Sequence, residues 1–122
     1  MPIKQLTSGT KGEIAVYVDD RGRCEVLDFV EQLSPLDQKK VLNLFNLFCE
    51  YGEIRNEQKF KHEDGRIFAF KSFQIRILCA FLPISGKRRV VLLHALKKKT
   101  DRMSKADLKK AQQLFDTIRE SN

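Results

Sequence analysis

Apolar residues in the first half of the chain recur at helical spacing, in two neighbouring segments. They are Val26, Phe29, Val30 and Leu33 in the first segment, and Val41, Leu44, Phe45 and Phe48 in the second. Ser34 and Pro35 stand between the segments and suit an N-cap and a first helical position, so they end one helix and begin the next. Gly52 is a natural stop. The pattern therefore predicts a helical hairpin.

The second half has longer apolar runs, at residues 66–73, 74–82 and 89–96, which read as three strands. The last two should be antiparallel, because residues 83–87 carry turn chemistry. Residues 13–18 read as a first strand, and residues 1–12 as a loose lead-in. Ser104 and Asp107 form an approximate capping box at the start of a last helix.

This order of elements predicts a single α+β domain over residues 1–122. An N-terminal strand and the helical hairpin pack on an antiparallel sheet, and a helix ends the chain. The strands are too apolar for one whole face of the sheet to be exposed to solvent. We therefore expect one face under the helical hairpin, and the other partly covered or used as a site.

Composition excludes several classes of protein. The chain has 122 residues, of which 42% are hydrophobic and 32% charged, as in ordinary globular proteins. Its apolar runs are too short to span a membrane. Its N-terminal residues lack the apolar core of a secretory signal peptide, so we expect a cytoplasmic protein. Cys24, Cys49 and Cys79 are widely spaced, which favours buried thiols over a zinc site or a disulfide framework.

Positive charge is concentrated in one region. Residues 54–105 hold 14 Lys or Arg and 4 Asp or Glu, a net charge of +10, whereas the rest of the chain has 9 and 12, a net charge of −3. Such a field favours a polyanion, and nucleic acid is the first candidate. The four acids of this region are Glu57, Glu63, Asp64 and Asp101, none of them inside a predicted strand. A two-metal nuclease needs clustered carboxylates, so we expect neither a metal site nor another cofactor.

Several residues of this region are candidates for chemistry. Lys71 and Arg76 interrupt apolar strands and should face solvent, a counter-ion or a ligand. Three lysines, residues 97–99, end the last strand, where they suit phosphates or merely protect a sheet edge. Alternation puts His94 on the face of Leu92 and Leu96, as a core histidine or a group for proton transfer. The aromatic residues of the region can stack on bases, although most of them must be core.

Four segments carry a resemblance to a known family. They read G-R-C-E-V-L-D-F-V-E-Q-L, R-I-F-A-F-K, I-R-I-L and L-L-H-A-L-K-K-K-T, in this order along the chain. With the order of elements, they resemble the RelE/HigB toxins, and most of all their phage-derived, HigB-like branch. The resemblance implies a RelE-like α+β fold. It also implies a type II toxin that cleaves mRNA, commonly on the ribosome, and a cognate antitoxin, often a helix-turn-helix protein.

The resemblance also assigns residues. In such toxins the substrate's 2′-hydroxyl attacks the adjacent phosphate, without a metal ion. Arg76 matches the family's strand arginine and would stabilise the phosphate, with Lys71 nearby. His94, Lys98 and Lys99 match the family's L-L-H-x-x-x-K-K-T segment. The residues that would hold RNA are Lys59, Lys61, Arg66 and Lys97.

Two other functions remain open. Ala69, Lys71 and Cys79 depart from the family pattern, and Lys71 lacks the bidentate fork of arginine. These departures favour a degenerate toxin that only binds RNA, DNA or an antitoxin. A structural or phage-assembly protein would show no salt-dependent affinity for RNA.

Overall fold

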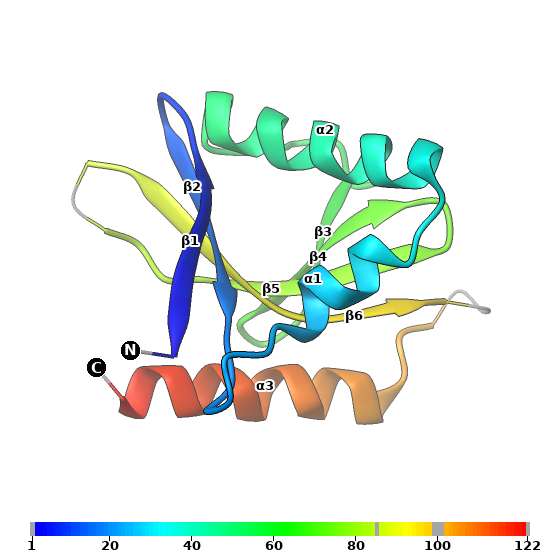
Figure 1. Cartoon of the computed structure of the whole chain (residues 1–122). Coiled ribbons are helices and arrows are strands. Elements are labelled where there is room, and N and C mark those ends of the chain that lie inside the picture. Colours follow the sequence, from blue (N-terminus) through cyan, green and yellow to red (C-terminus); the bar gives the residue numbers. More distant parts are fainter. Residues whose placement is uncertain (1, 85, 99–101, 122) are drawn as a thin grey trace.

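A computed structural model of the protein describes residues 2–84, 86–98 and 102–121, and it has a single sheet flanked by helices (Figure 1). The strands are β1 (Ile3–Ser8), β2 (Gly12–Tyr17), β3 (Phe60–Asp64), β4 (Ile67–Ser72), β5 (Ile75–Phe81) and β6 (Arg88–Lys97). The helices are α1 (Glu25–Glu31), α2 (Pro35–Tyr51) and α3 (Lys105–Glu120). The predicted α+β class is confirmed.

The sheet is mixed and not purely antiparallel as predicted. Its strand order is β1-β2-β6-β5-β4-β3, and β2 runs parallel to β6 while all other neighbours are antiparallel. Gly12 pairs with Arg88 and Val16 with Leu92, so the last strand lies beside the N-terminal hairpin. The predicted antiparallel pairing of the last two strands, now β5 and β6, is confirmed.

Two segments that seemed irregular in the sequence are strands. The predicted loose lead-in contains β1, whose Ile3 pairs with Tyr17 of β2. The polar segment before residue 66 contains β3, whose Phe60 is buried opposite Phe70. Both strands lie at the edges of the sheet, where a single neighbour supplies the hydrogen bonds and polar side chains are tolerated.

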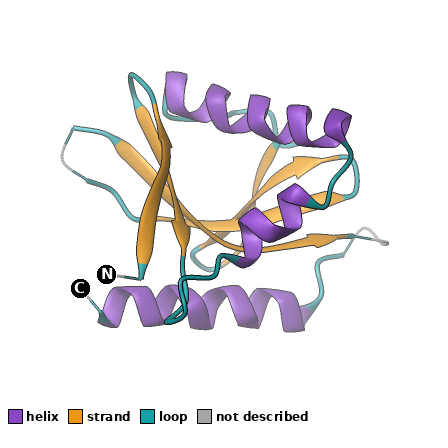
Figure 2. Cartoon of the chain, in the orientation of Figure 1, coloured by secondary structure: helices purple, strands orange, loops and turns teal. Residues whose placement is uncertain are grey.

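Both faces of the sheet are covered by helices (Figure 2). Helices α1 and α2 cover one face, where Phe45, Phe48 and Phe70 belong to one buried cluster. Helix α3 covers the other face, where Phe115 and Ile118 pack in a second cluster. The predicted helical hairpin thus covers one face, and the strands are highly apolar because each face buries side chains.

The helix ends follow the predicted caps. The Ser34 hydroxyl accepts a hydrogen bond from the Asp37 amide at 3.2 Å, and Pro35 begins α2. Gly52 ends α2 with a left-handed φ of 74°, a conformation that glycine adopts without a steric penalty. At the start of α3, the Ser104 hydroxyl accepts from the Asp107 amide at 3.1 Å. These local signals fix where α2 and α3 begin.

Candidate functional site

Lys71 and Arg76 are direct cross-strand partners near the turn between β4 and β5. Arg76 lies between Ile75 and Ile77, which pack in the α2 layer, so alternation directs it to the opposite face. Direct partners share a face of the sheet, and the Nζ of Lys71 reaches the carbonyl of Glu57 at 3.1 Å. The fold therefore brings together two cations that lie in separate strands.

The ammonium of Lys71 lies in a strongly positive environment. Burial lowers the pKa of Lys71, and repulsion from Arg76, Lys61 and Lys98 lowers it further, while Glu63 acts in the opposite direction. Two like charges only partly shielded from water repel one another appreciably. The site therefore combines crowded positive charge with a lysine that gives up its proton more easily than an exposed one.

Arg76 is half-buried and bonded to the turn beside it. Its Nη1 donates to the carbonyl of Phe73 at 2.5 Å and to that of Ile75 at 2.9 Å. Its Nε is buried and has no hydrogen-bond partner among the described residues. A guanidinium has five N–H donors. A buried N–H donor without a hydrogen-bond acceptor is energetically unfavourable.

The turn held by Arg76 is strained. Phe73 has a φ of 53°, and no other non-glycine residue in the described part of the chain has a positive φ. A bulky side chain is disfavoured in this conformation. The ring is nevertheless 76% exposed, with the Nζ of Lys40 at 4.2 Å from its centroid. The turn thus presents an aromatic ring at the edge of the basic site.

The other predicted basic residues are divided by the fold. Lys97 pairs with Ile75 at the end of β6, and the amide of Lys98 donates to the carbonyl of Gln74 at 2.6 Å, so both flank the Phe73 turn. Lys59 and Lys61 are exposed, Lys59 just before β3 and Lys61 in it. Arg66 precedes β4 and is separated from Lys71 by about 17 Å of extended strand, so the fold does not bring it to this site. Lys99 lies outside the described residues.

His94 lies between two helices and not on the face that alternation predicted. Leu92 packs in the α2 layer and Leu96 against the α3 layer. They separate because the register between β5 and β6 shifts after Leu78, and such a bulge turns the following side chains over. The prediction that His94 shares one face with both leucines is therefore wrong.

Both ring nitrogens of His94 are bonded to carboxylates. Nδ1 is bonded to Glu25 at the start of α1, and Nε2 lies 2.7 Å from Oδ1 of Asp107 in the first turn of α3. The Nζ of Lys110 donates to Glu25 at 2.6 Å, and the Ser104 hydroxyl donates to Asp107 at 2.6 Å. These five residues, which we call the histidine clamp, join β6 to both helices.

The ionisation of the clamp follows from these contacts. The hydrogen bond to Glu25 raises the pKa of His94, against an opposing effect of burial, and the bond to Asp107 raises it further. Burial of Glu25 disfavours its charge, but the bonds from His94 and Lys110 prevail and lower its pKa to about 2. The hydrogen bond from Ser104 lowers the pKa of Asp107. The clamp is therefore a charged pair of carboxylates around an imidazolium.

Sequence reasoning missed the partners of these groups. The sequence marked Asp107 only as part of a capping box, and it did not single out Glu25, Lys110 or Lys40. Their partners are distant in sequence, so no local pattern marks them. The one local signal was Phe73, a bulky residue in a two-residue turn where asparagine or glycine is usual.

Comparison with known proteins gives a family for the chain. Residues 28–116 match the family described as phage-derived protein Gp49-like (DUF891). The chain belongs to this family, which is toxin-like and of the RelE/HigB type. A toxin-like family implies an antitoxin partner. No curated protein matches the chain.

Two properties of the described residues bear on the site. They contain no group of three or more His, Cys, Asp or Glu side chains placed to hold a metal ion. None of the helices in the described part is both long and apolar enough to cross a membrane.

Proposed function

We propose that this protein is the toxin of a type II toxin–antitoxin system and a metal-independent endoribonuclease with a RelE-like fold. Its substrate would be mRNA, bound on the ribosome, and its cognate antitoxin would be a helix-turn-helix protein. The proposal rests above all on Lys71 and Arg76 being direct cross-strand partners, with Lys61 and Lys98 close enough for their charges to act on Lys71.

The residues have complementary roles in this chemistry. The 2′-hydroxyl of the substrate gives up its proton and attacks the adjacent phosphate, and negative charge develops on the phosphate oxygens. The bond to the 5′-oxygen then breaks, which leaves a 2′,3′-cyclic phosphate, and the departing 5′-oxygen takes up a proton. Arg76 suits the stabilisation of the negative charge because a guanidinium is permanently charged and presents its donors in a planar fork that matches phosphate oxygens. Lys71 suits both charge stabilisation and proton transfer, because its pKa is lowered. Lys98 and Lys99 complete the predicted catalytic set, and Lys59, Lys61 and Lys97 would hold the RNA backbone.

In this proposal His94 has a different part from the one its motif implies. A general acid or base must reach the reacting oxygens, and both ring nitrogens of His94 are engaged with Glu25 and Asp107. We therefore assign His94 to positioning: it holds β6 to the first turns of α1 and α3. Its catalytic role stays a prediction that the pH dependence of cleavage tests.

The test uses expression without the antitoxin. Wild type should arrest growth, and the purified chain should cleave translated RNA in the presence of EDTA, leaving 2′,3′-cyclic phosphate ends. Lys71→Met and Arg76→Ala should each reduce cleavage at least tenfold, on the scale of lost electrostatic stabilisation. Arg21→Ala, in the exposed turn after β2, is the matched control. Circular dichroism verifies that each variant is folded.

A second function is favoured by one observation. The guanidinium of Arg76 is bonded to two carbonyls of its own turn, a structural use that a binding module without catalysis would retain. In that case the wild type binds RNA or an antitoxin in a salt-dependent manner and produces no cleavage. A wild-type chain that neither arrests growth nor cuts translated RNA would exclude the nuclease.

A further inference from the structure

A hollow of about 510 Å³ opens between α2 and the end of β4, closed on one side by the loop before β3. It borders the basic site, because Lys71 lines it and Phe73, whose carbonyl holds Arg76, forms its rim. The volume lies in the range of small-molecule pockets. The hollow is therefore a pocket that adjoins the basic site and shares Lys71 with it.

The lining of the hollow carries three kinds of chemistry. Lys40, Lys59 and Lys71 are among the lining residues, and no carboxylate of the described residues lines the hollow. Leu44 and Leu47 of α2 supply an apolar wall. The lysines are thus complementary to an anionic group of a ligand, and the two leucines to a flat apolar group of the same ligand.

Amide side chains complete the lining. Asn43 on α2, with Asn56 and Gln58 in the loop before β3, contributes donors and acceptors of the kind that read the edge of a base. The carbonyl oxygen of the Asn56 side chain accepts from the amide of Gln58 at 2.8 Å, which fixes the orientation of that side chain. A pre-oriented amide binds without losing much rotamer freedom.

The rim residue Phe73 provides independent support. Its ring is 76% exposed and its backbone is strained, and strain of this kind gathers at ligand sites. Asparagine or glycine would relieve the strain, and a polar residue would remove the exposed apolar surface. Lys40 now stacks on the ring, and a nucleobase stacks on an aromatic ring in the same way.

From these contacts we infer that the hollow binds one nucleotide of a single-stranded RNA, with the base stacked on Phe73 and its edge facing Asn43 and Asn56. The adjacent phosphate lies at Lys71 and Arg76. Lys40 leaves the ring for the phosphate backbone as the base takes its place. This inference rests on the proposed function for the identity of the ligand, and it makes the hollow the source of base preference around the cleaved bond.

The test measures binding of 2′-O-methyl oligoribonucleotides, which lack the attacking hydroxyl and so are bound but not cut. Phe73→Asn relieves the strain and removes the ring, and it should weaken binding about fivefold or more, on the scale of one base stacked on an aromatic residue. In the Asn43→Ala variant, the differences in affinity among oligonucleotides that carry different bases should become smaller, because Asn43 faces the edge of the base. Phe73→Tyr should bind within about twofold of wild type, since the ring is kept.

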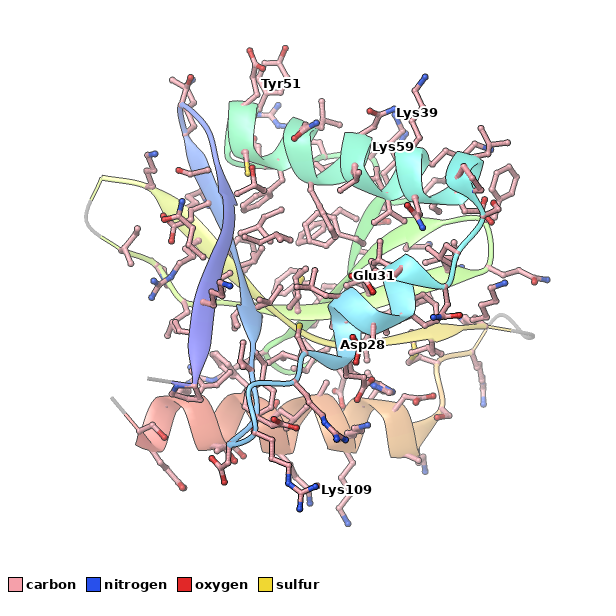
Figure 3. All side chains as sticks on the ribbon, viewed as in Figure 1. Asp28, Glu31, Lys39, Tyr51, Lys59 and Lys109 are labelled. Carbon is pink, nitrogen blue, oxygen red and sulfur yellow. The ribbon has the colours of Figure 1, made fainter. Side chains whose placement is uncertain are left out.

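A matched control lies on α2, at the C-terminal end of this helix and away from the part that lines the hollow. Tyr51 is 59% exposed and points away from the sheet (Figure 3), so Tyr51→Asn should leave binding unchanged. Since the chain has no tryptophan, Phe73→Trp gives a single tryptophan at the rim, which can be excited selectively at a wavelength that tyrosine does not absorb. Its emission should be quenched when an oligonucleotide binds, and an unaltered emission at saturation would overturn the inference.

The remaining outcomes separate the inference from the proposed function. Binding that needs Lys71 but is equal in wild type and Phe73→Asn overturns the nucleotide pocket and leaves the nuclease standing. Binding that depends on Phe73 without any cleavage of unmodified RNA supports the pocket and overturns the nuclease. If Phe73→Asn leaves oligonucleotide binding unchanged and weakens only the complex with a cognate antitoxin, the hollow is a protein-docking site and the inference is wrong.

Discussion

The Nε2 nitrogen of His94 lies 2.7 Å from Oδ1 of Asp107, while Nδ1 of the same ring is bonded to Glu25. One imidazole from β6 thus links the first turns of α1 and α3. Only 11% of its side-chain surface is exposed, so the two carboxylates replace water as its environment. The contact is a structural link with a built-in dependence on pH.

We predict that this link gives the protein a stability maximum at mildly acidic pH. The pKa of His94 is raised from 6.5, so its contribution is complete below pH 6.5 and is lost as the pH rises through the folded-state value. The pKa of Glu25 is lowered from 4.5 to about 2, so its contribution is present above pH 4.5 and is lost as the pH falls towards 2. The free energy of unfolding should therefore be highest between these limits, as urea titrations at a series of pH values would show.

His94→Gln tests the same link by mutation. Charged hydrogen bonds contribute about 1.5–3 kcal/mol each, and partial exposure of both carboxylates reduces this. We therefore expect the free energy of unfolding to fall by about 2 kcal/mol near pH 5.5 and its pH profile to flatten. His62→Gln, at an exposed position of β3, is the control. Parallel profiles for wild type and His94→Gln would show that the clamp does not govern the pH dependence.

A second prediction concerns the packing of β2 against α2. A Cβ atom added at Gly12 would lie 2.6 Å from the backbone oxygen of Phe48. The helix carbonyl has nowhere to move, because Phe48 is fully buried. Gly12→Ala should lower the free energy of unfolding by about 2–3 kcal/mol, measured in urea. Gly22→Asn, which meets nothing within 4 Å and keeps a residue tolerant of positive φ, should change it little.

A third prediction concerns the thiols. Cys24, Cys49 and Cys79 are all buried, and burial raises the pKa of each, most of all that of Cys79. The thiolate is the reactive form. An aromatic disulfide reagent should therefore label the native protein slowly and the unfolded protein rapidly at all of these cysteines. Rapid native labelling at Cys79 would contradict the buried packing of β5.

A fourth prediction concerns the charge of the basic site. Binding to single-stranded RNA should weaken with salt, and removing one cation that neutralises a phosphate should reduce the logarithmic slope by about 0.7. Lys61→Ala should reduce the slope by one such step, because Lys61 acts on Lys71. Lys39→Ala removes a charge that points outward from α2 (Figure 3) and should leave the slope unchanged. Equal slopes for wild type and both variants would remove Lys61 from the interface.

The sequence predicted those elements whose signals are local. The caps Ser34, Gly52 and Ser104 lie within a few residues of the turns they stabilise, so α2 and α3 begin where expected. Strands β4 to β6 were visible because both faces of each are apolar. Strand β1 was not, because its conformation depends on pairing with β2 and its own residues are half polar.

The candidate site was predictable in its residues and not in its arrangement. Lys71 and Arg76 stood out as charges in apolar runs. What places them opposite one another is the tight turn at Phe73, which the apolar pattern alone does not define. The bulge that turns His94 towards Glu25 depends on the register with β5, and that register is a property of two strands together. Lys40 joins the site only because α2 lies over this end of the sheet.

The place of β6 in the sheet has a consequence for synthesis. It is the strand that joins the N-terminal hairpin of β1 and β2 to the β3–β5 meander, and its Arg88 pairs with Gly12, far away in the sequence. Contacts so distant in sequence form late in folding. A nascent chain that stops before residue 88 therefore has two sheet fragments with no strand between them.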